Sequence, residues 1–426
     1  MPNQQEITAA NELLSFIYDS PSIYHVVSNL AKKLDEAGFE ELAENRRWKI
    51  QPGKSYYVRR NNSSLIAIRV PEGEADSFLV SAAHSDSPCF KIKENAELRN
   101  DSYVRVNTEK YGGAIFSTWF DRPLSAAGRV FVETENGIEE RLVRLQDNLL
   151  IIPNVAIHQN RAVNDGVALK ANVDTLPLLA LGRDDVSINT LAAEAAGVDP
   201  EKVLGKDLFL FCSERGCLAG ARGDMMLSPR LDDLACATAL LRGLMEAETV
   251  NQISVCCIFD NEEVGSGTKQ GAGSTMIRDI LRRLVTALGK DEEDFQILAA
   301  NAVFVSADNA HAIHPNHPEY FDADNSPLIN KGIVIKFNAT QKYATDGKAC
   351  AFFRSVCRKA GVGTQVFFNR SDLAGGGTLG SILSTVLPMN TVDIGLPQLA
   401  MHSAFETAGV SDYLSLIKAM TGFYEA

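Results

Sequence analysis

Apolar residues recur at helical spacing near the start of the chain and at strand-like spacing from about residue 55 onward. Between residues 7 and 42 they lie three or four positions apart on both sides of a Ser20-Pro21 break, which predicts two helices. The runs SYYVRR and SLIAIRV then have the short, β-favouring pattern of strands. The next run, SFLVSAAH, is almost continuously apolar and predicts a strand that is buried on both faces.

The middle of the chain has a different pattern from its C-terminal part. Between about residues 91 and 222, short alternating runs such as YVRVNTEKYGG, GRVFVE and KDLFLFCSER predict a β-rich segment. From residue 228 onward, helical patterns alternate with apolar strands such as QISVCCIFD and NAVFVSAD, which favours an open α/β sheet covered on both faces. We therefore predict an α/β protein with a discontinuous catalytic domain, residues 1–92 and 228–426, and an inserted β-rich domain, residues 93–227.

The charge balance narrows the classes of partner. The 426 residues include 41 basic and 54 acidic side chains, a net charge of −13, whereas nucleic acids and anionic membranes attract basic surfaces. No stretch reaches the roughly 20 apolar residues that span a bilayer, and the first residues lack the pattern of a secretion signal. The 8 cysteines are scattered along the chain. This favours free thiols in a reducing compartment over disulfides. We expect a cytoplasmic protein that binds neither nucleic acid nor membrane.

The first candidate for chemistry follows the buried strand of SFLVSAAH. His84 and Asp86 lie at its carboxyl end, where open α/β sheets bind ligands. Their spacing would let Asp86 orient the imidazole of a metal-binding His84 by accepting a hydrogen bond from its other ring nitrogen. Taken alone, the pair is more typical of a polar strand end that is capped by its own turn.

Two further acidic pairs come later in the chain. Asp232 and Asp233 open a predicted helix in SPRLDDL, where carboxylates also occur simply because they suit the helix dipole. Glu262 and Glu263 come after the buried strand ISVCCIFD and precede a glycine-rich loop. A buried strand that delivers two carboxylates to a sheet edge suggests that one binds a metal ion and the other moves protons.

Asp308 ends the strand-like run NAVFVSAD, and His402 lies in MHSAFETAG after another strand-like run. Each has an ordinary structural explanation, but together with the earlier residues they match the ligands of a two-metal hydrolase. Oxygen and imidazole ligands without thiolates suit zinc, manganese or cobalt. The pattern therefore predicts two divalent metal ions that activate water and hold a substrate carbonyl.

Six motifs together closely resemble the aspartyl aminopeptidase family of dinuclear-metal aminopeptidases. They are SAAHSD, YGGAIFSTWFDRPL, SPRLDDL, FDNEEVGS, SADNAHAIHPN and PQLAMHS, in this order between about residues 81 and 409. The resemblance implies that Asp232 bridges two metal ions, most simply zinc. It also implies that His84 and Asp308 complete one metal site, and Glu263 and His402 the other. Glu262 would then be the general base and acid, with Asp86 orienting His84.

The same resemblance implies an assembly and two further site residues. Members of the family form a tetrahedral dodecamer, in which His158 would reach a neighbouring subunit's active site and stabilise the oxyanion. Lys336 in IVIKFN would meet an acidic substrate side chain. The residues alone favour plainer interpretations, a strand-end histidine for His158 and an edge-strand lysine for Lys336.

The sequence departs from the eukaryotic pattern of the family in FFNRSDLAGGGTLG, at Ser371 and Gly375. This loop would line the substrate pocket. The sequence therefore supports the metal chemistry more strongly than it supports a preference for N-terminal Asp or Glu. The sequence therefore predicts a metal-dependent aminopeptidase that acts on peptides, with acidic N-terminal residues as the first expectation. The alternatives are a related dinuclear-metal carboxypeptidase or deacylase and a non-catalytic, metal-stabilised binding or assembly protein.

Overall fold

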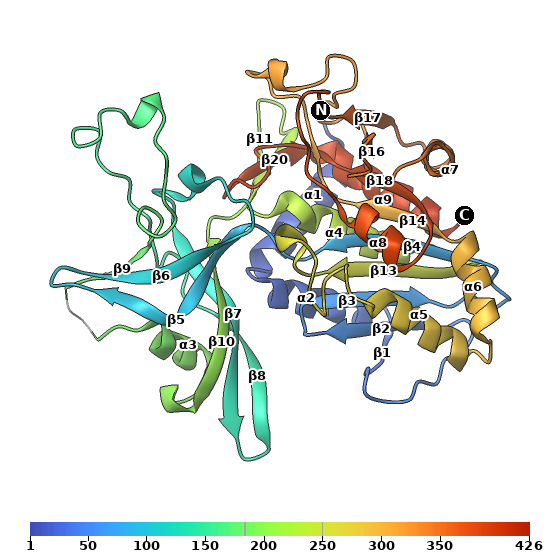
Figure 1. Cartoon of the computed structure of the whole chain (residues 1–426), viewed down its shortest axis with the longest axis horizontal. Helices are drawn as coiled ribbons and strands as arrows, with labels where there is room; N and C mark the ends of the chain where they lie inside the picture. Colours follow the sequence, from blue (N-terminus) through green and yellow to red (C-terminus); the bar gives the residue numbers. More distant parts are fainter. Residues whose placement is uncertain (183–184, 249) are drawn as a thin grey trace.

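The computed structural model describes residues 1–182, 185–248 and 250–426 of the chain. In this part of the chain the strands form sheets of nine, six and five strands. Figure 1 shows an α/β body around the nine-stranded sheet, and a second lobe that consists mainly of the six-stranded sheet. Among the described residues, no helix is both long enough and apolar enough to cross a membrane.

Two helices open the chain, as predicted. Helix α1 spans Gln4–Asp19 and helix α2 spans Ile23–Glu36, with the Ser20-Pro21 break between them. A capping box starts α1, because the Asn3 side chain accepts from the Glu6 backbone N–H at 3.0 Å while the Glu6 side chain accepts from that of Asn3 at 2.7 Å. The apolar faces of both helices pack into the core beside the large sheet.

The nine-stranded sheet has the order β1-β2-β3-β13-β4-β14-β18-β16-β17. Its central strands β13, β4, β14 and β18 run parallel to one another, while β3 and β16 run antiparallel beside them. The strands span Glu40–Glu41, Ser55–Arg60, Ser64–Arg69, Ile253–Phe259, Phe78–His84, Val303–Ala307, Asn390–Gly395, Ile333–Phe337 and Thr364–Phe368, in sheet order. Strand β4 is buried along its whole length, as its apolar sequence predicts.

Helices cover both faces of this sheet. One face packs against α1, α2 and three later helices, α4 (Leu231–Glu246), α7 (Gly347–Lys359) and α9 (Val410–Tyr424). The other face packs against α5 (Met276–Ala287), α6 (Glu292–Asn301) and α8 (Leu379–Val386). The predicted α/β class, with a sheet buried between two helical layers, is confirmed.

The six-stranded sheet is antiparallel throughout and has the order β8-β7-β10-β5-β6-β9. Its strands span Gly137–Arg144, Leu124–Thr134, Val203–Cys212, Cys89–Arg99, Tyr103–Tyr111 and Leu178–Leu181 in that order. One helix, α3 (Ile188–Ala196), packs against it. The β-rich character of this part of the chain is as expected, whereas its exact limits as a domain stay a prediction.

A small third sheet, which the sequence did not suggest, joins distant segments beside the large one. Its order is β11-β12-β20-β19-β15. The strands span Cys217–Ala219, Met225–Ser228, Glu406–Gly409, Pro397–Leu399 and Ala310–His311. Strand β12 precedes the acidic start of α4, and the loop between β19 and β20 contains His402. The small sheet therefore brings two predicted metal-binding segments to one place.

Candidate metal centre

His84 and Asp86 lie together at the carboxyl end of β4. The His84 side chain is only 1% exposed, and Asp86 is completely buried. The imidazole Nδ1 is 3.1 Å from the Asp86 carbonyl oxygen and 3.4 Å from its carboxylate, while Nε2 is 3.6 Å from the Asp232 carboxylate. One ring nitrogen thus faces Asp86 and the other faces an acidic partner, the orientation that a metal-binding histidine needs.

Asp232 lies at the start of α4, but it is not a solvent-exposed carboxylate of a helical first turn. Its backbone and that of Asp233 are not helical, and the peptide bond between them is cis. One carboxylate oxygen of Asp232 is 3.6 Å from His84 Nε2, and the other is 3.4 Å from His402 Nε2. The carboxylate therefore presents one oxygen to each of two histidines, as a ligand shared by two ions would.

The glutamate pair follows β13 in a short 3-10 turn, Glu262–Val264. Phe259 at the end of β13 pairs in register with His84, so the turn begins beside the histidine. The two oxygens of the Asp86 carboxylate accept from the backbone N–H groups of Glu262 and Glu263, each at 3.1 Å. Asp86 therefore links the histidine to the turn that carries both glutamates.

His402 reaches the same place from the loop between β19 and β20. Its Nε2 is 3.4 Å from the carboxylates of both Asp232 and Glu263. Its Nδ1 is 3.2 Å from the carbonyl oxygen of Gly113, and its backbone has a left-handed φ of 67°. The side chain is 31% exposed, so this edge of the centre is open to solvent.

Asp308 directly follows β14, the neighbour of β4 in the sheet. Its carboxylate is 3.4 Å from Lys336 Nζ, and its negative charge adds to the effect of burial in raising the pKa of Glu262. Lys336 is 2% exposed and donates to the carbonyl oxygens of Asp308 at 2.7 Å and Asn309 at 3.2 Å. The expectation of an edge-strand lysine is wrong, because β16 lies between β18 and β17.

His158 does not join the other predicted residues within this subunit. It lies exposed in the loop before β9. In the described part of the chain, its side chain makes no hydrogen bond or ion pair with a residue of the cluster. A role in the active site would therefore require a second copy of the chain.

The cluster has the chemistry of a cation site. Ligand atoms of His84, Asp232 and Glu263 all lie within 4.8 Å of one another. Asp232 Oδ1 and Glu263 Oε1 are buried without a hydrogen-bond partner, and buried carboxylates are normally paired. Burial, together with the charge of Asp232, holds the pKa of Glu263 well above its usual range. Converging, unpartnered carboxylates and imidazoles fit divalent metal ions.

Two other carboxyl groups of the cluster, those of Asp232 and Glu262, have pKa values shifted in opposite directions. Burial opposes the ionisation of Asp232, but the nearby imidazoles of His402 and His84 outweigh it and lower its pKa. Burial raises the pKa of Glu262 to about 7. A carboxyl group with a pKa near neutrality can both take up and release a proton at physiological pH.

Sequence reasoning missed two supports of this centre. Glu406 accepts from the backbone N–H of Asp232 at 3.0 Å and from that of His402 at 2.8 Å, so one buried carboxylate holds both segments. The Tyr111 hydroxyl donates to the Asp86 carboxylate at 2.7 Å and accepts from Asn261 at 2.9 Å. The sequence does contain a signal for Tyr111, because this residue begins the YGG run of one of the six motifs.

The two glycines of that run allow β6 to approach the cluster closely. A Cβ at Gly112, whose φ is 70°, would lie 3.1 Å from the Glu263 Cβ, and one at Gly113 would lie 3.3 Å from His402 Nδ1. Larger side chains here would press on both residues. The six-stranded sheet therefore supplies one wall of the metal centre.

The chain is similar to known proteins over nearly its whole length. Residues 16–424 match the family model of aminopeptidase I zinc metalloproteases, M18. The chain belongs to the M18 family. It is 44% identical over 430 residues to a probable M18 family aminopeptidase 2 of Clostridium novyi, covering 99% of both chains. A probable M18 family aminopeptidase 2 of Pseudomonas aeruginosa is 38% identical over 97% of both chains.

Solved structures of M18 proteins share the fold. The chain has a TM-score of 0.96 and 34% identity to a chain from the Ape4 and Nbr1 complex, covering 99% of this chain and 86% of that one. It has a TM-score of 0.87 and 27% identity to the Saccharomyces cerevisiae mApe1 dodecamer, covering 99% and 97%. Two predictions are confirmed. The chain belongs to the family that includes aspartyl aminopeptidases, and it is a metallo-aminopeptidase. This M18 protein is thus an enzyme of the zinc metalloprotease type.

Proposed function

We propose that this M18 aminopeptidase removes the N-terminal residue of peptides with two divalent metal ions, zinc in the first instance and manganese or cobalt as alternatives. Asp232 would hold both ions, His84 and Asp308 one of them, and Glu263 and His402 the other. The observation that carries the proposal is the Asp232 carboxylate, which directs one oxygen toward each histidine. Bound ions would supply Lewis-acid activation of water and of the scissile carbonyl.

Glu262 is the proton carrier in this proposal. It takes a proton from the attacking water and passes it to the leaving amine. The support is its pKa of about 7 and its position beside the cluster, where among the described residues it forms no ion pair with either histidine. Asp86 fixes the Glu262 backbone and orients His84, so it acts on the reaction through these two residues.

We also propose that the enzyme prefers N-terminal Asp or Glu and that Lys336 meets the acidic side chain. Burial opposes the charge of Lys336, but the negative charge of Asp308 outweighs it and raises the pKa, so the ammonium group persists at neutral pH. Lys336 also donates to the carbonyl oxygens of Asp308 and Asn309, so a test must separate substrate recognition from support of Asp308. If Lys336 only supports Asp308, then Lys336→Met will lower turnover equally for acidic and neutral substrates.

The assembly proposed for the enzyme is a tetrahedral homododecamer, with His158 entering a neighbour's active site. One support is the dodecamer that an S. cerevisiae relative forms. His158→Phe should then lower turnover while the metal content stays unchanged, whereas wild-type kinetics in a verified oligomer would remove His158 from the site. A cytoplasmic location is proposed from the 8 free cysteines.

The decisive experiment measures release of the N-terminal residue from matched free-amine and N-acetylated peptides. It is run on the native enzyme, after chelation, and after zinc, manganese or cobalt is restored. Metal-restored cleavage of free-amine peptides alone, fastest for Asp or Glu, is the expected result. Cleavage of the acetylated peptides would favour a carboxypeptidase or deacylase. Cleavage of neither set by metal-loaded oligomer would favour a binding or assembly protein.

A further inference from the structure

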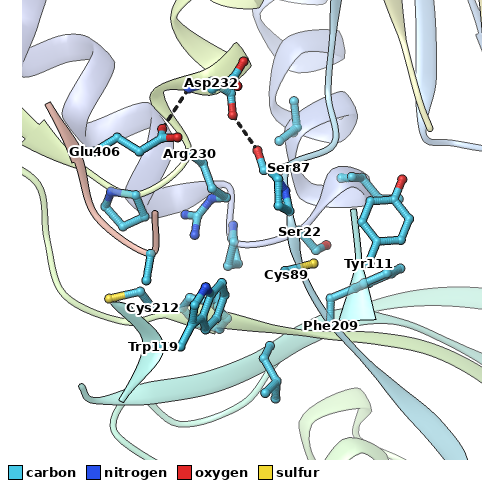
Figure 2. A pocket seen from close by; sticks show the side chains of 18 of the residues that line it. Ser22, Ser87, Cys89, Tyr111, Trp119, Phe209, Cys212, Arg230, Asp232 and Glu406 are labelled. Carbon is cyan, nitrogen blue, oxygen red and sulfur yellow. Dashed lines mark hydrogen bonds between the residues drawn. The ribbon is translucent and has the colours of Figure 1, made fainter. Parts of the chain in front are cut away.

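A small cavity lies behind the metal centre, where the six-stranded sheet meets the α/β body. Its volume is about 40 Å³, which exceeds the roughly 10–15 Å³ that a single water needs. The wall combines residues of α2, β10 and the segment before α4. Figure 2 shows Arg230 and Trp119 within this space, with the indole ring nitrogen on the side that faces the guanidinium group.

Two hydrogen-bond donors in this cavity have no acceptor among the described residues. Arg230 Nε and Trp119 Nε1 are both buried and unpartnered. Trp119 is only 4% exposed, and its ring packs edge-on against Phe90 at 5.2 Å, which fixes its orientation. Buried N–H groups normally have partners, so two of them beside one cavity indicate a missing acceptor.

Several other polar groups of the wall are already paired. Ser22 Oγ bonds to His25 at 2.8 Å, and Ser87 Oγ donates to the Asp232 carbonyl oxygen at 2.8 Å. Figure 2 shows the Ser87 bond and the one that joins Asp232 to Glu406. The Glu406 oxygens are occupied by the backbone N–H groups of Asp232 and His402. These groups therefore do not supply the missing acceptor.

The missing acceptor should carry negative charge. Arg230 donates through Nη2 to the Ile17 carbonyl oxygen at 2.8 Å, and among the described residues it has no ion pair with a carboxylate. The nearby thiols do not balance it, because burial raises the pKa of both Cys89 and Cys212 and keeps them neutral. Because Arg230 forms no ion pair, a negatively charged acceptor at its free Nε gains a stronger hydrogen bond than a neutral water would.

We infer that the cavity binds one small monovalent anion of the halide class between Arg230 Nε and Trp119 Nε1. The small volume suits a small ion, and the carboxylates of Asp232 and Glu406 in the same wall disfavour a divalent one. Trp119 belongs to the lobe of the six-stranded sheet, whereas Arg230 leads directly into α4 of the α/β body. The bound anion therefore joins the two parts of the enzyme immediately behind the metal centre.

Thermal unfolding of the full-length enzyme tests the site. Chloride or bromide replaces isethionate, a larger sulfonate, at constant ionic strength. We expect a saturable rise in Tm with halide for the wild type. In Trp119→Phe the halide concentration for half-maximal effect should rise at least tenfold, and in Arg230→Met the effect should disappear. Trp48→Phe is the matched control, because Trp48 donates to the Ala43 carbonyl oxygen and should keep the full halide response.

Crystals soaked in bromide locate the ion independently of the variants. An anomalous peak within hydrogen-bond distance of both nitrogens, together with the saturable Tm response, supports the inference. A peak without any halide dependence of the wild-type Tm would mean an adventitious ion only. Water in the cavity, or an equal halide response in the wild type and Trp119→Phe, would also overturn the inference. If a variant fails to fold, the anomalous peak and the halide titration of the wild-type Tm still test the inference.

Discussion

The two sides of the metal centre are built in different ways. His84 and the glutamate turn stand at the ends of adjacent parallel strands, β4 and β13, inside the large sheet. His402 stands on a loop between two short strands and depends on Glu406 and on Gly113 of the other lobe. One side is thus fixed by the main sheet, and the other by contacts between segments that are distant in sequence. Substitution of Glu262 on the first side should affect chemistry, and substitutions among the supports of the second should affect metal retention.

Glu262→Gln is the strongest test of the strand side. It removes the proposed proton carrier without removing a ligand, so turnover should fall about 10²–10⁴-fold while the metal content stays near that of the wild type. Activity assays combined with elemental analysis measure both. Glu263→Gln is the matched control and should lose metal. Metal loss in Glu262→Gln instead would mean that the roles of the two glutamates are reversed.

Glu406→Ala tests the loop side. Both backbone N–H groups that donate to Glu406 would lose their partner, and the segments of Asp232 and His402 would no longer be joined. Metal affinity should fall about 10–100-fold, as for other groups that orient metal ligands. Competition with a chelator measures this change. Glu425→Ala is the control, because Glu425 also accepts from a backbone N–H, that of Glu248, but outside the site. Equal metal affinity in both variants would contradict the comparison.

Tyr111→Phe tests how strongly the six-stranded sheet supports the side of the centre that carries His84 and the glutamate turn. It removes one hydrogen bond to the Asp86 carboxylate and keeps the ring. The value of kcat should fall about tenfold, which corresponds to about 1.5 kcal/mol, the lower end for hydrogen bonds to charged groups. KM and metal content should change little. Tyr57→Phe, which removes a hydroxyl bonded to Asp35 at 2.8 Å, should leave kcat unchanged. A metal loss in Tyr111→Phe would place Tyr111 among the supports of metal retention.

Asp412→Asn has the smallest expected effect and concerns stability outside the centre. Burial raises the pKa of Asp412 from its ordinary value of 3.8 to about 7. Because the folded pKa is raised, this group contributes stability that is full below the unfolded pKa and is lost as the pH rises through the folded pKa of about 7. The wild type should therefore lose stability between about pH 4 and 7 relative to Asp412→Asn. Chemical unfolding at several pH values measures this difference, and parallel curves would refute the raised pKa.

The same contrast between strand ends and loops separates what the sequence could reveal from what it could not. His84, Glu262, Glu263 and Asp308 come at the ends of apolar strands, and parallel strands bring their carboxyl ends to one edge, so their meeting could be anticipated. The helices, the order of strands along the chain and the α/β class could be predicted from the same periodicity. These features depend on neighbours that are close in sequence.

Other features depend on contacts that no local pattern records. Glu406 looks like one acid in a short strand until Asp232 and His402 approach it from two directions. Lys336 looks like an edge residue because the sequence does not state which strand lies beside β16. The cavity of Arg230 and Trp119 forms only where two separate sheets meet. Pairing between distant segments determines each of them.

The position of Asp232 in the chain also sets the order in which the enzyme can mature. Ser87 and the Asp232 carbonyl oxygen form a hydrogen bond across 145 residues, and the whole six-stranded sheet lies between them. Contacts between residues so far apart form late in folding, because a long loop must close first. His402 comes later still in the chain. With the proposed ligands, metal capture would therefore be a checkpoint that only a correctly looped chain extending past His402 can pass, and chains that end before His402 should remain without metal and without activity.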